Sequence, residues 1–267
     1  MTFWKRFTKC HIGNKIITSD KLDIFFSVKA NTTGEADSAE ITIFNMAAET
    51  KEAIEPETLI QLEAGYVGDY GTVFLGTVES LEDEAAGADI QTTITCISGM
   101  SKFIEGCVNK SYPAGQKLTD IAKDQIQLAG ISNFQIDDND MVFEEKKVYT
   151  VATNLRTNLI ELAKNLDYDF VERRGSVLLT AKNSGVVEGF LLNSDSGLLE
   201  VRKVVKKEGA EDKYDFDITT FLIYRIAQDS IIELDSKISG KKLCKVIEAA
   251  FISNNTDHIC QMKVAII

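Results

Sequence analysis

The alternation of apolar and polar residues is the feature that most limits how this chain can fold. Apolar side chains occupy every second position from Leu22 to Ala30 and again over most of Ser38 to Asn45. This period is that of a β-strand with one buried face. Residues 31–37 between the two segments are small or polar, as in a hairpin connection. The pattern predicts two neighbouring antiparallel strands.

Three evenly spaced glycines, Gly65, Gly68 and Gly71, raise the question of a phosphate-binding loop. Such a loop places its glycines between a strand and the N-terminus of a helix. Here the residues after Gly71 alternate as in a strand, the spacing is G-x-x-G-x-x-G, and no Gly-Lys-Ser/Thr occurs in the sequence. The segment therefore predicts a hairpin turn, in which Asp69 favours the bend.

Some segments have helical spacing and a capping or stopping residue at one end. They are 45–55, with Asn45 as N-cap and Pro56 as stop, Leu118–Ala129, which ends at Gly130, and Leu155–Leu166, with Thr153 or Asn154 as N-cap. The two longer helices each carry an apolar stripe, with Leu128 included in the first, so both are expected to be amphipathic. Arg173–Ser176 is predicted to be a turn between two further strands.

These patterns predict an α+β fold that is mainly β. We expect a β-barrel-like module with one short helix over residues 1–105 and an inserted small α/β module, of two helices and a hairpin, over 106–184. A second β-barrel-like module is expected over 185–267. A chain of 267 residues exceeds the usual size of one domain, which agrees with such a division.

The charge of the chain argues against some partners. The formal net charge is -12, so the average field repels nucleic-acid backbones and anionic lipid headgroups. The basic runs Arg173–Arg174 and Arg202–Lys207 are interpreted as solvated faces. We expect no sequence-specific nucleic-acid binding and no membrane insertion.

The N-terminus and the cysteines indicate the compartment. No uninterrupted apolar run has the length of a signal peptide or a membrane span, so we expect synthesis and retention in the cytosol. The cysteines are odd in number and widely spaced, which predicts free buried thiols instead of a disulfide framework. They are Cys10, Cys96, Cys107, Cys244 and Cys260.

Candidate catalytic and metal-binding residues are few. The sequence contains His11, next to Cys10, and His258, on one strand face with Cys260. A zinc site from these four residues is conceivable, but the spacing fits no known zinc pattern and strand packing is favoured. The serine-glycine context near Ser98 and Ser101 lacks the strand-to-helix setting of a nucleophile.

Acidic runs are the other candidate for chemistry. Glu82–Glu84 and Asp137–Asp140 could in principle supply a glycosidase pair, but in so acidic a chain they are interpreted as solvated loops. Val142 stands where a calcium hand requires glycine. The sequence therefore predicts no catalytic, cofactor-binding or metal-binding residues, no cofactor and no enzyme activity.

Aromatic residues on the predicted strands favour packing. Phe25, Phe26, Phe44, Tyr66 and Phe74 are expected in the core or at an interface. Two segments, Ile24–Phe26 and Phe221–Tyr224, present apolar groups on both faces of a strand. Such segments need a second cover besides the core, and another subunit is one candidate.

The order of these segments resembles a known family. In residues 38–80 a strand ends in Asn45, a helix begins near Glu49-Thr50, and a strand closes on Ala64-Gly65-Tyr66 before a turn and a Phe-x-Gly strand. The corresponding residues are Ala64, Gly65, Tyr66, Gly71, Phe74 and Gly76. This region resembles the N-terminal module of phage tail baseplate hub proteins, including those of tail-like bacteriocins (tailocins) and the late control protein D-like hubs.

Other parts of the chain resemble the same family less closely. The helix and hairpin at 159–180 are similar to the family's middle module, with Asp167 where glycine is commoner. In the C-terminal module, Gln228-Asp229-Ser230 replaces a Val-Gly-Asp. The resemblance continues to the end of the chain.

The resemblance implies a structural protein of the virion. It implies a homotrimer in which two β modules per chain form a pseudo-sixfold ring that adapts the hexameric tail tube to a distal spike or tip. The implied partners are the tail tube or distal tail protein, the end of the tape-measure protein, and spike, tip or other baseplate proteins. The implied location is the tail baseplate or tip, assembled in the host cytoplasm. An acidic lumen that repels DNA is a further hypothesis.

Two alternatives remain open from the sequence. One is a tail-associated cell-wall hydrolase, for which a peptidoglycan zymogram with and without Glu82–Glu84 would decide. The other is a soluble ligand-binding β protein, which predicts a monomer with a deep pocket.

Overall fold

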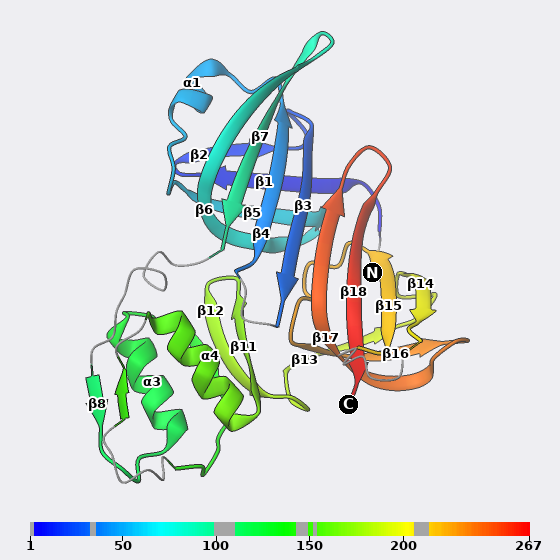
Figure 1. The fold of residues 1–267 in the computed structure, drawn as a ribbon. Coiled ribbons are helices and arrows are strands. Elements are labelled where there is room, and N and C mark those ends of the chain that lie inside the picture. The colour runs from blue at the N-terminus through cyan, green and yellow to red at the C-terminus, as the bar shows by residue number, and fades with distance from the viewer. Residues whose placement is uncertain (1–2, 33–35, 99–109, 143–148, 152–153, 206–213) are drawn as a thin grey trace. The chain divides into compact units, whose positions relative to one another are not determined.

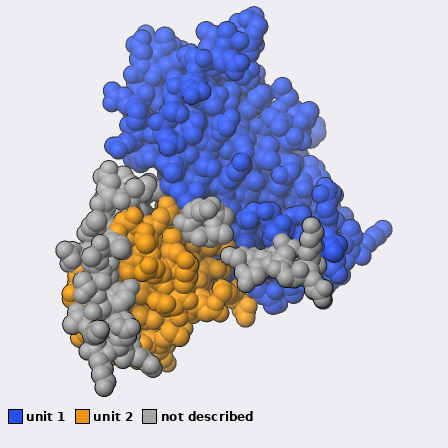
Figure 2. Space-filling model, in the orientation of Figure 1, with its two compact units in different colours: residues 1–31, 36–98, 186–267 blue, residues 32–35, 99–185 orange. Residues whose placement is uncertain are grey.

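The fold is α+β and mainly β. The computed structural model describes residues 3–32, 36–98, 110–142, 149–151, 154–205 and 214–267 (Figure 1). The chain forms two compact units, coloured separately in Figure 2. Unit 1 comprises residues 1–31, 36–98 and 186–267, and unit 2 comprises residues 32–35 and 99–185. The division into modules 1–105, 106–184 and 185–267, the first and last barrel-like, stays a prediction.

Unit 1 is built around one sheet, which has 13 strands in the described part of the chain. The first seven strands are β1 (Arg6–Ile12), β2 (Lys15–Thr18), β3 (Ile24–Asn31), β4 (Ser38–Phe44), β5 (Leu59–Tyr66), β6 (Asp69–Ala86) and β7 (Asp89–Ile97). The others are β13 (Val186–Leu192), β14 (Leu198–Lys203), β15 (Phe216–Phe221), β16 (Ser230–Ser236), β17 (Gly240–Ser253) and β18 (His258–Ile266). A short helix, α1 (Ala48–Glu52), lies between β4 and β5.

Two long strands, β6 and β17, each serve two parts of the sheet. The first part of β6 pairs with β5 and its second part pairs with β7, with a bulge between Val78 and Ser80. In the same way β17 pairs first with β16 and then with β3, and its bulge against β18 lies between Val246 and Glu248. Bulges bend a strand and let it leave one layer for another, as β6 does in Figure 1.

The two ends of unit 1 have the same strand topology. In the series β3–β7, β3 pairs with β4, β4 pairs with β7, and the long strand β6 pairs with both β5 and β7. The strands β14–β18 repeat these antiparallel pairings: β14 pairs with β15, β15 pairs with β18, and the long strand β17 pairs with both β16 and β18. We call β3–β7 repeat A and β14–β18 repeat B. Unit 1 therefore contains an internal structural repeat.

An unusual backbone conformation recurs at one position of the repeat. Glu57 and Asp229 both have a left-handed φ, +69° and +67°. Glu57 lies just before β5 and Asp229 just before β16. The backbone N–H of each donates to the carbonyl oxygen of the valine at the bulge, Val78 or Val246. The N···O distance is 2.8 Å in both repeats. This shared detail supports the equivalence of the two repeats.

The repeats are joined by a strand pair and share one core. β17 of repeat B pairs with β3 of repeat A, with Phe251 opposite Val28 and Ile252 opposite Ser27. The sheet order is β14-β15-β18-β17-β3-β4-β7-β6-β5-β1-β2. The buried apolar residues of both repeats form a single cluster, which includes Ile41, Ile94, Phe251 and Val264.

Unit 2 packs helices on a small sheet. Its helices are α3 (Leu118–Leu128) and α4 (Leu155–Leu166), and its strands are β8 (Lys110–Tyr112), β9 (Phe134–Ile136), β10 (Tyr149–Val151), β11 (Tyr168–Arg173) and β12 (Ser176–Ala181). β11 and β12 form a hairpin, β9 pairs parallel to β12, and β8 pairs with β10. Apart from Leu128, the apolar stripes of both helices pack in a core separate from that of unit 1.

Several local predictions are confirmed. β3 and β4 are antiparallel neighbours, β5 and β6 form the glycine hairpin with Gly68 at φ +87°, and the turn after Arg173 joins β11 to β12. α4 has the predicted bounds, and Asn154 caps it by accepting the N–H of Thr157 at 2.8 Å. Thr153, the other candidate cap, lies outside the described residues.

The predicted cap of α1 is wrong. The N-cap of α1 is Ala47, which makes no side-chain capping bond. Asn45 instead has a left-handed φ of +54°, donates its side-chain amide to Asp89 at 2.9 Å and accepts the N–H of Ile90 at 3.0 Å. A residue that binds the start of β7 cannot also cap the helix. The expectation that Leu128 belongs to the buried stripe of α3 is also wrong, because its side chain is exposed.

Candidate assembly surface

Each of three glycines in the family resemblance has a steric role in unit 1. Gly65 has φ +151°, and a Cβ there would overlap the backbone at Asp69. A Cβ at Gly76 would overlap the carbonyl oxygen of Ile97 on β7, and one at Gly71 would overlap the ring of Tyr224. These glycines therefore serve close packing of strands and of the two repeats, and not the approach of a phosphate.

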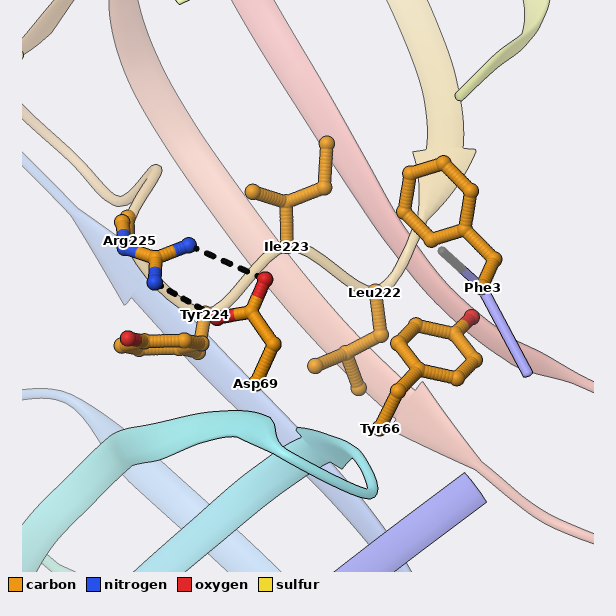
Figure 3. Close-up of a pocket in the computed structure, with 7 residues that line it drawn as sticks. All are labelled: Phe3, Tyr66, Asp69, Leu222, Ile223, Tyr224 and Arg225. Atoms are coloured by element: carbon orange, nitrogen blue, oxygen red, sulfur yellow. Dashed lines mark hydrogen bonds and ion pairs between the residues drawn. The ribbon is translucent and has the colours of Figure 1, made fainter. Parts of the chain in front are cut away.

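The contact of Gly71 with Tyr224 belongs to the junction between the repeats. Here a small pocket is lined by Phe3, Tyr66, Asp69, Leu222, Ile223, Tyr224 and Arg225 (Figure 3). Its free volume is about 10 Å³, which is room for about one water molecule. The pocket therefore suits the packing of side chains better than the binding of a substrate.

A charge pair crosses this junction. Both guanidinium nitrogens of Arg225 donate to the carboxylate of Asp69, at 2.5 and 3.3 Å (Figure 3). The bond with Asp69 raises the pKa of Arg225 above its already high usual value. The guanidinium also lies over the Tyr224 ring, 4.5 Å from its centroid. Asp69, the expected turn residue, thus also fastens the β5–β6 hairpin to repeat B.

His258 is a structural histidine. Its side chain is 2% exposed, its Nε2 donates to the carbonyl of Gly65 at 2.8 Å, and its Nδ1 accepts the hydroxyl of Ser253 at 2.9 Å. Burial lowers the pKa of His258 to about 4, with the nearby positive charge of Arg6 adding to the effect. A neutral ring with both nitrogens engaged by the protein is positioned for packing.

Arg6 links the start of the chain to repeat B. Its guanidinium donates to three carbonyl oxygens of the turn between β17 and β18, those of Asn254, Thr256 and Asp257, at 2.6 to 3.2 Å. β1, which carries Arg6, pairs with β5. The sequence pattern did not indicate this link, because the partners are backbone atoms far along the chain.

The zinc hypothesis finds no support in the placement of its four residues. His11 lies 3.2 Å from Glu63 on the face of β1 opposite Cys10, while His258 and Cys260 are buried on one face of β18, as expected. Within the residues that the structure describes, no group of three His, Cys, Asp or Glu side chains could hold a metal ion. Strand packing accounts for both histidines.

The described cysteines and Ser98 are buried parts of the structure. Cys10, Cys96, Cys244 and Cys260 are free and buried, as predicted, and Cys107 lies outside the described residues. Burial raises the pKa of Cys96 to about 12 and that of Cys244 to about 11, which disfavours the reactive thiolate. Ser98 is buried and binds the backbone N–H of Asp37, and Ser101 lies outside the described residues.

The charged runs differ in part from their interpretation. Glu82–Glu84 lies on the exposed second half of strand β6 and not in a loop. Asp137–Asp140 connects β9 to later segments, and Asp137 accepts the N–H of Ala181 at 2.9 Å. Arg202 and Lys203 are exposed on β14, but Arg173 is only 8% exposed, so the expectation of a solvated face at Arg173 is wrong.

Most residues of the segments that are apolar on both faces are covered within the chain, while Phe221 remains 36% exposed. Phe25 packs on Phe44 on the outer face of the sheet, with ring centroids 4.9 Å apart. Of the segment Phe221–Tyr224, only Phe221 belongs to a strand, and Leu222 and Ile223 are buried at the junction. For Leu222 and Ile223, the second cover is therefore the other repeat of the same chain.

The face of the sheet opposite the core is mostly polar along β4 and β7 of repeat A, beside the Phe25–Phe44 pair. Alternate residues of β4 and β7 on this face include Glu40, Thr42, Thr93 and Thr95, and the hydroxyls of Thr42 and Thr93 lie 3.1 Å apart. Among the described residues, no helix is long and apolar enough to span a membrane. We consider two surfaces of unit 1 for a partner, the mostly polar outer face along β4 and β7 and the outer edges of the sheet.

Comparison of the sequence with known families finds no matching family profile, and no curated protein sequence matches it. Solved structures do match. The 43 kDa tail protein of prophage MuSo2 from Shewanella oneidensis has a TM-score of 0.68 at 11% identity, with 97% of this chain and 96% of that chain covered. The fold is that of phage tail proteins.

Two further structures with this phage tail protein fold cover the chain as fully. A tail protein from Neisseria meningitidis has a TM-score of 0.66 at 9% identity, covering 98% of this chain and 96% of that one. An Escherichia coli component of the type VI secretion system, described as similar to the phage T4 tail proteins gp27 and gp5, has a TM-score of 0.68 at 8% identity. It covers 97% of this chain and 77% of that one. The resemblance to tail hub proteins is confirmed at the level of fold.

Proposed function

We propose that this chain is a structural component of a phage or phage-like tail, namely a baseplate hub. Three copies form a ring of six equivalent positions that joins the hexameric tail tube to the distal spike or tip. The observation that carries the proposal is the internal repeat of unit 1, in a chain with the phage tail protein fold. The chain acts through interfaces and catalyses no reaction.

The repeat provides a physical reason for a threefold object to match a sixfold one. A chain that contains one interface unit twice presents two similar surfaces, related by the operation that superposes one repeat on the other. If that operation is a rotation that closes, further copies of the chain continue it into a ring. Three chains then supply six units, one for each subunit of a hexameric tube.

The partners follow from this position. On one side of the ring we expect the tail tube or a distal tail protein, and on the other the spike, tip or other baseplate proteins, with the end of the tape-measure protein in the lumen. The chain is assembled in the host cytoplasm and remains in the virion. The polar, threonine-rich outer face of repeat A, which carries Glu40, suits a lumen that does not retain DNA.

Native mass spectrometry of the full chain over a range of concentrations tests the proposal. A complex of three chains that appears as a ring in negative-stain images is the expected result. A peptidoglycan zymogram is run beside it as the test of the hydrolase alternative. A chain that stays monomeric at every concentration, or that cleaves peptidoglycan, contradicts the proposal.

A further inference from the structure

The outer edges of the sheet in unit 1 carry opposite charges. The second half of β6 pairs with β7 on one side only, and there it carries the exposed run Glu82–Glu84. At the other end of the sheet, β14 pairs with β15 on one side only and carries the exposed residues Arg202 and Lys203. In the part of the chain that the structure describes, no strand covers either edge. Such edges are templates for strand pairing.

The register of the repeats fixes which residues correspond on the long strands. The bulge lies between Val78 and Ser80 in β6 and between Val246 and Glu248 in β17. Counting on from these bulges, Asp83 of β6 corresponds to Phe251 of β17. By the same count, Glu84 corresponds to Ile252.

The same register fixes the correspondence at the other edge. Val78 is opposite Cys96, Cys96 is opposite Ala39, and Ala39 is opposite Val28 on β3. The same path in repeat B begins at Val246 and runs through Val264 and Phe216 to Lys203 on β14. Lys203 therefore corresponds to Val28.

The neighbouring position on these edge strands follows directly. Ser27 is opposite Glu40, and Arg202 is opposite Asp217, each next to the pair just described. Arg202 therefore corresponds to Ser27. The residues of β14 thus have counterparts on β3, as those of β17 have on β6.

We propose that the second half of β6 in one chain pairs antiparallel with β14 of the next chain, in the register of the internal β17–β3 pair. Inside the chain, Phe251 lies opposite Val28 and Ile252 lies opposite Ser27. In the contact between chains, Asp83 takes the place of Phe251 and Lys203 of a second copy takes the place of Val28, so these two residues lie opposite one another. In the same way Glu84 lies opposite Arg202 of the second copy. This inference rests on the proposed ring, for which it names the contact between chains.

The charges at these positions independently fit this register. Both of the predicted pairs join an acidic residue to a basic one, which favours the contact across strands. The acidic run on the β6 edge also repels a copy of itself, so two β6 edges are discouraged from pairing. The charges thus favour a head-to-tail contact, which is the kind that generates rings.

Arg202 and Asp83 each already have a partner within the chain. Arg202 pairs with Glu200 at 3.0 Å, with both side chains more than half exposed, and Lys51 pairs with Asp83 at 3.0 Å. The Arg202–Glu200 pair is exposed and therefore worth little, so its exchange for a contact to a second copy costs little. Asp83 is held more firmly, because the Lys51 side chain is only 16% exposed and the hydroxyl of Thr92 also donates to Asp83, at 2.6 Å. The backbone N–H and C=O groups of both edges gain partners at the same time.

Cysteine cross-linking tests the register directly. The experiment uses the full chain with Cys107→Ser and the pair Asp83→Cys with Lys203→Cys, because opposed residues of paired strands lie within reach of a disulfide. The described native cysteines are buried. Oxidation is expected to yield covalent dimers and trimers that reduction dissolves. The matched control is Glu82→Cys with Lys203→Cys, whose side chains point to opposite faces and are expected to remain unlinked.

Charge exchange tests the same contact without cysteine. Glu84→Arg alone and Arg202→Glu alone each place like charges opposite one another, and each is expected to raise the protein concentration needed for assembly by about tenfold or more. The double variant Glu84→Arg/Arg202→Glu is expected to return it to within about threefold of the original. Failure of the double variant to recover, with both single variants weakened, overturns the register.

The outcomes separate this contact from the proposed function. Trimers without cross-links in the Asp83→Cys/Lys203→Cys variant overturn the β6–β14 contact and leave the hub proposal standing. Cross-links in open chains or in a ring of another size support the contact and overturn the trimeric hub. Equal cross-linking of the Glu82→Cys control overturns the register. A chain that neither assembles nor cross-links overturns both proposals.

Discussion

Gly71 shows how one residue without a side chain connects two distant parts of the chain. The ring of Tyr224 occupies the space where a Cβ would stand, and Tyr224 in turn packs beside Arg225, which binds Asp69. The spacing of the glycines predicted a hairpin and not a phosphate loop. It could not predict Tyr224 as the neighbour, because glycine leaves no pattern that identifies what approaches it.

Gly71→Ala tests this close approach. We expect it to destabilise unit 1 by about 1–3 kcal/mol, because the added methyl group overpacks the contact with Tyr224. Hydrogen exchange of the β5 and β6 amides in the full chain is the measurement. In a Tyr224→Ala background the same change is expected to cost less than about 0.5 kcal/mol, since the obstacle is gone. Equal costs in both backgrounds would show that the ring is not the cause.

His258 makes the stability of unit 1 depend on pH. Its pKa is about 4 in the folded chain against about 6.5 in the unfolded chain. Between these values the unfolded state binds more protons, so the free energy of unfolding falls as the pH falls from about 6.5 towards 4, by up to about 3 kcal/mol. Above about 6.5 neither state binds this proton and the contribution is constant.

The His258→Gln variant isolates this contribution. An amide does not titrate, so we expect lower stability at pH 7.5, from the altered bonds to Gly65 and Ser253, and a shallower loss between pH 6.5 and 4. Urea unfolding at several pH values measures both effects. The idea fails if the variant loses stability over this window as steeply as the original chain.

At the scale of elements, most of the fold could be predicted from periodicity. Strict alternation located β3 and β4, and the apolar stripe with its cap located α4. Two boundaries failed for physical reasons. The run Glu82–Glu84 breaks the alternation, yet β6 continues through it, because an edge strand outside the core needs no buried face. Asn45 is a good capping residue by type, but it is used to bind the start of β7.

The ends of α4 allow a test of capping. Asn154→Ala removes the bond to the N–H of Thr157 and is expected to destabilise the helix by about 1 kcal/mol. Asp167 holds a left-handed φ of +57°, so Asp167→Gly is expected to stabilise it by up to about 1 kcal/mol, less the loss of its ion pair with Lys182. Hydrogen exchange of the α4 amides in the full chain measures both changes.

Glu161→Ala, an exposed change in the middle of α4, is the control for the capping test. We expect it to alter exchange by less than about 0.5 kcal/mol. A loss in this control as large as in Asn154→Ala would contradict a specific role of the cap.

At the scale of the whole molecule, the internal repeat is the feature that the sequence concealed. Equivalent positions hold unlike residues, such as Phe251 and Asp83, or Val28 and Lys203, so no periodicity in the sequence reveals them. Alternation marks a segment as a strand but does not say which strand it pairs with. The charged runs were visible in the sequence as Glu82–Glu84 and Arg202–Lys207, and only the topology relates the first run to Arg202 and Lys203 as opposite edges of one sheet.

The central claim is that the two repeats of unit 1 occupy neighbouring positions around one axis, so that three chains complete six positions. Electron cryo-microscopy of the assembled chain tests it most directly. We expect a closed ring of three chains in which repeats A and B alternate around the axis, with β14 of each chain beside β6 of the next. A map in which the repeats of one chain lie at unrelated positions, or in which the ring holds another number of chains, would contradict it.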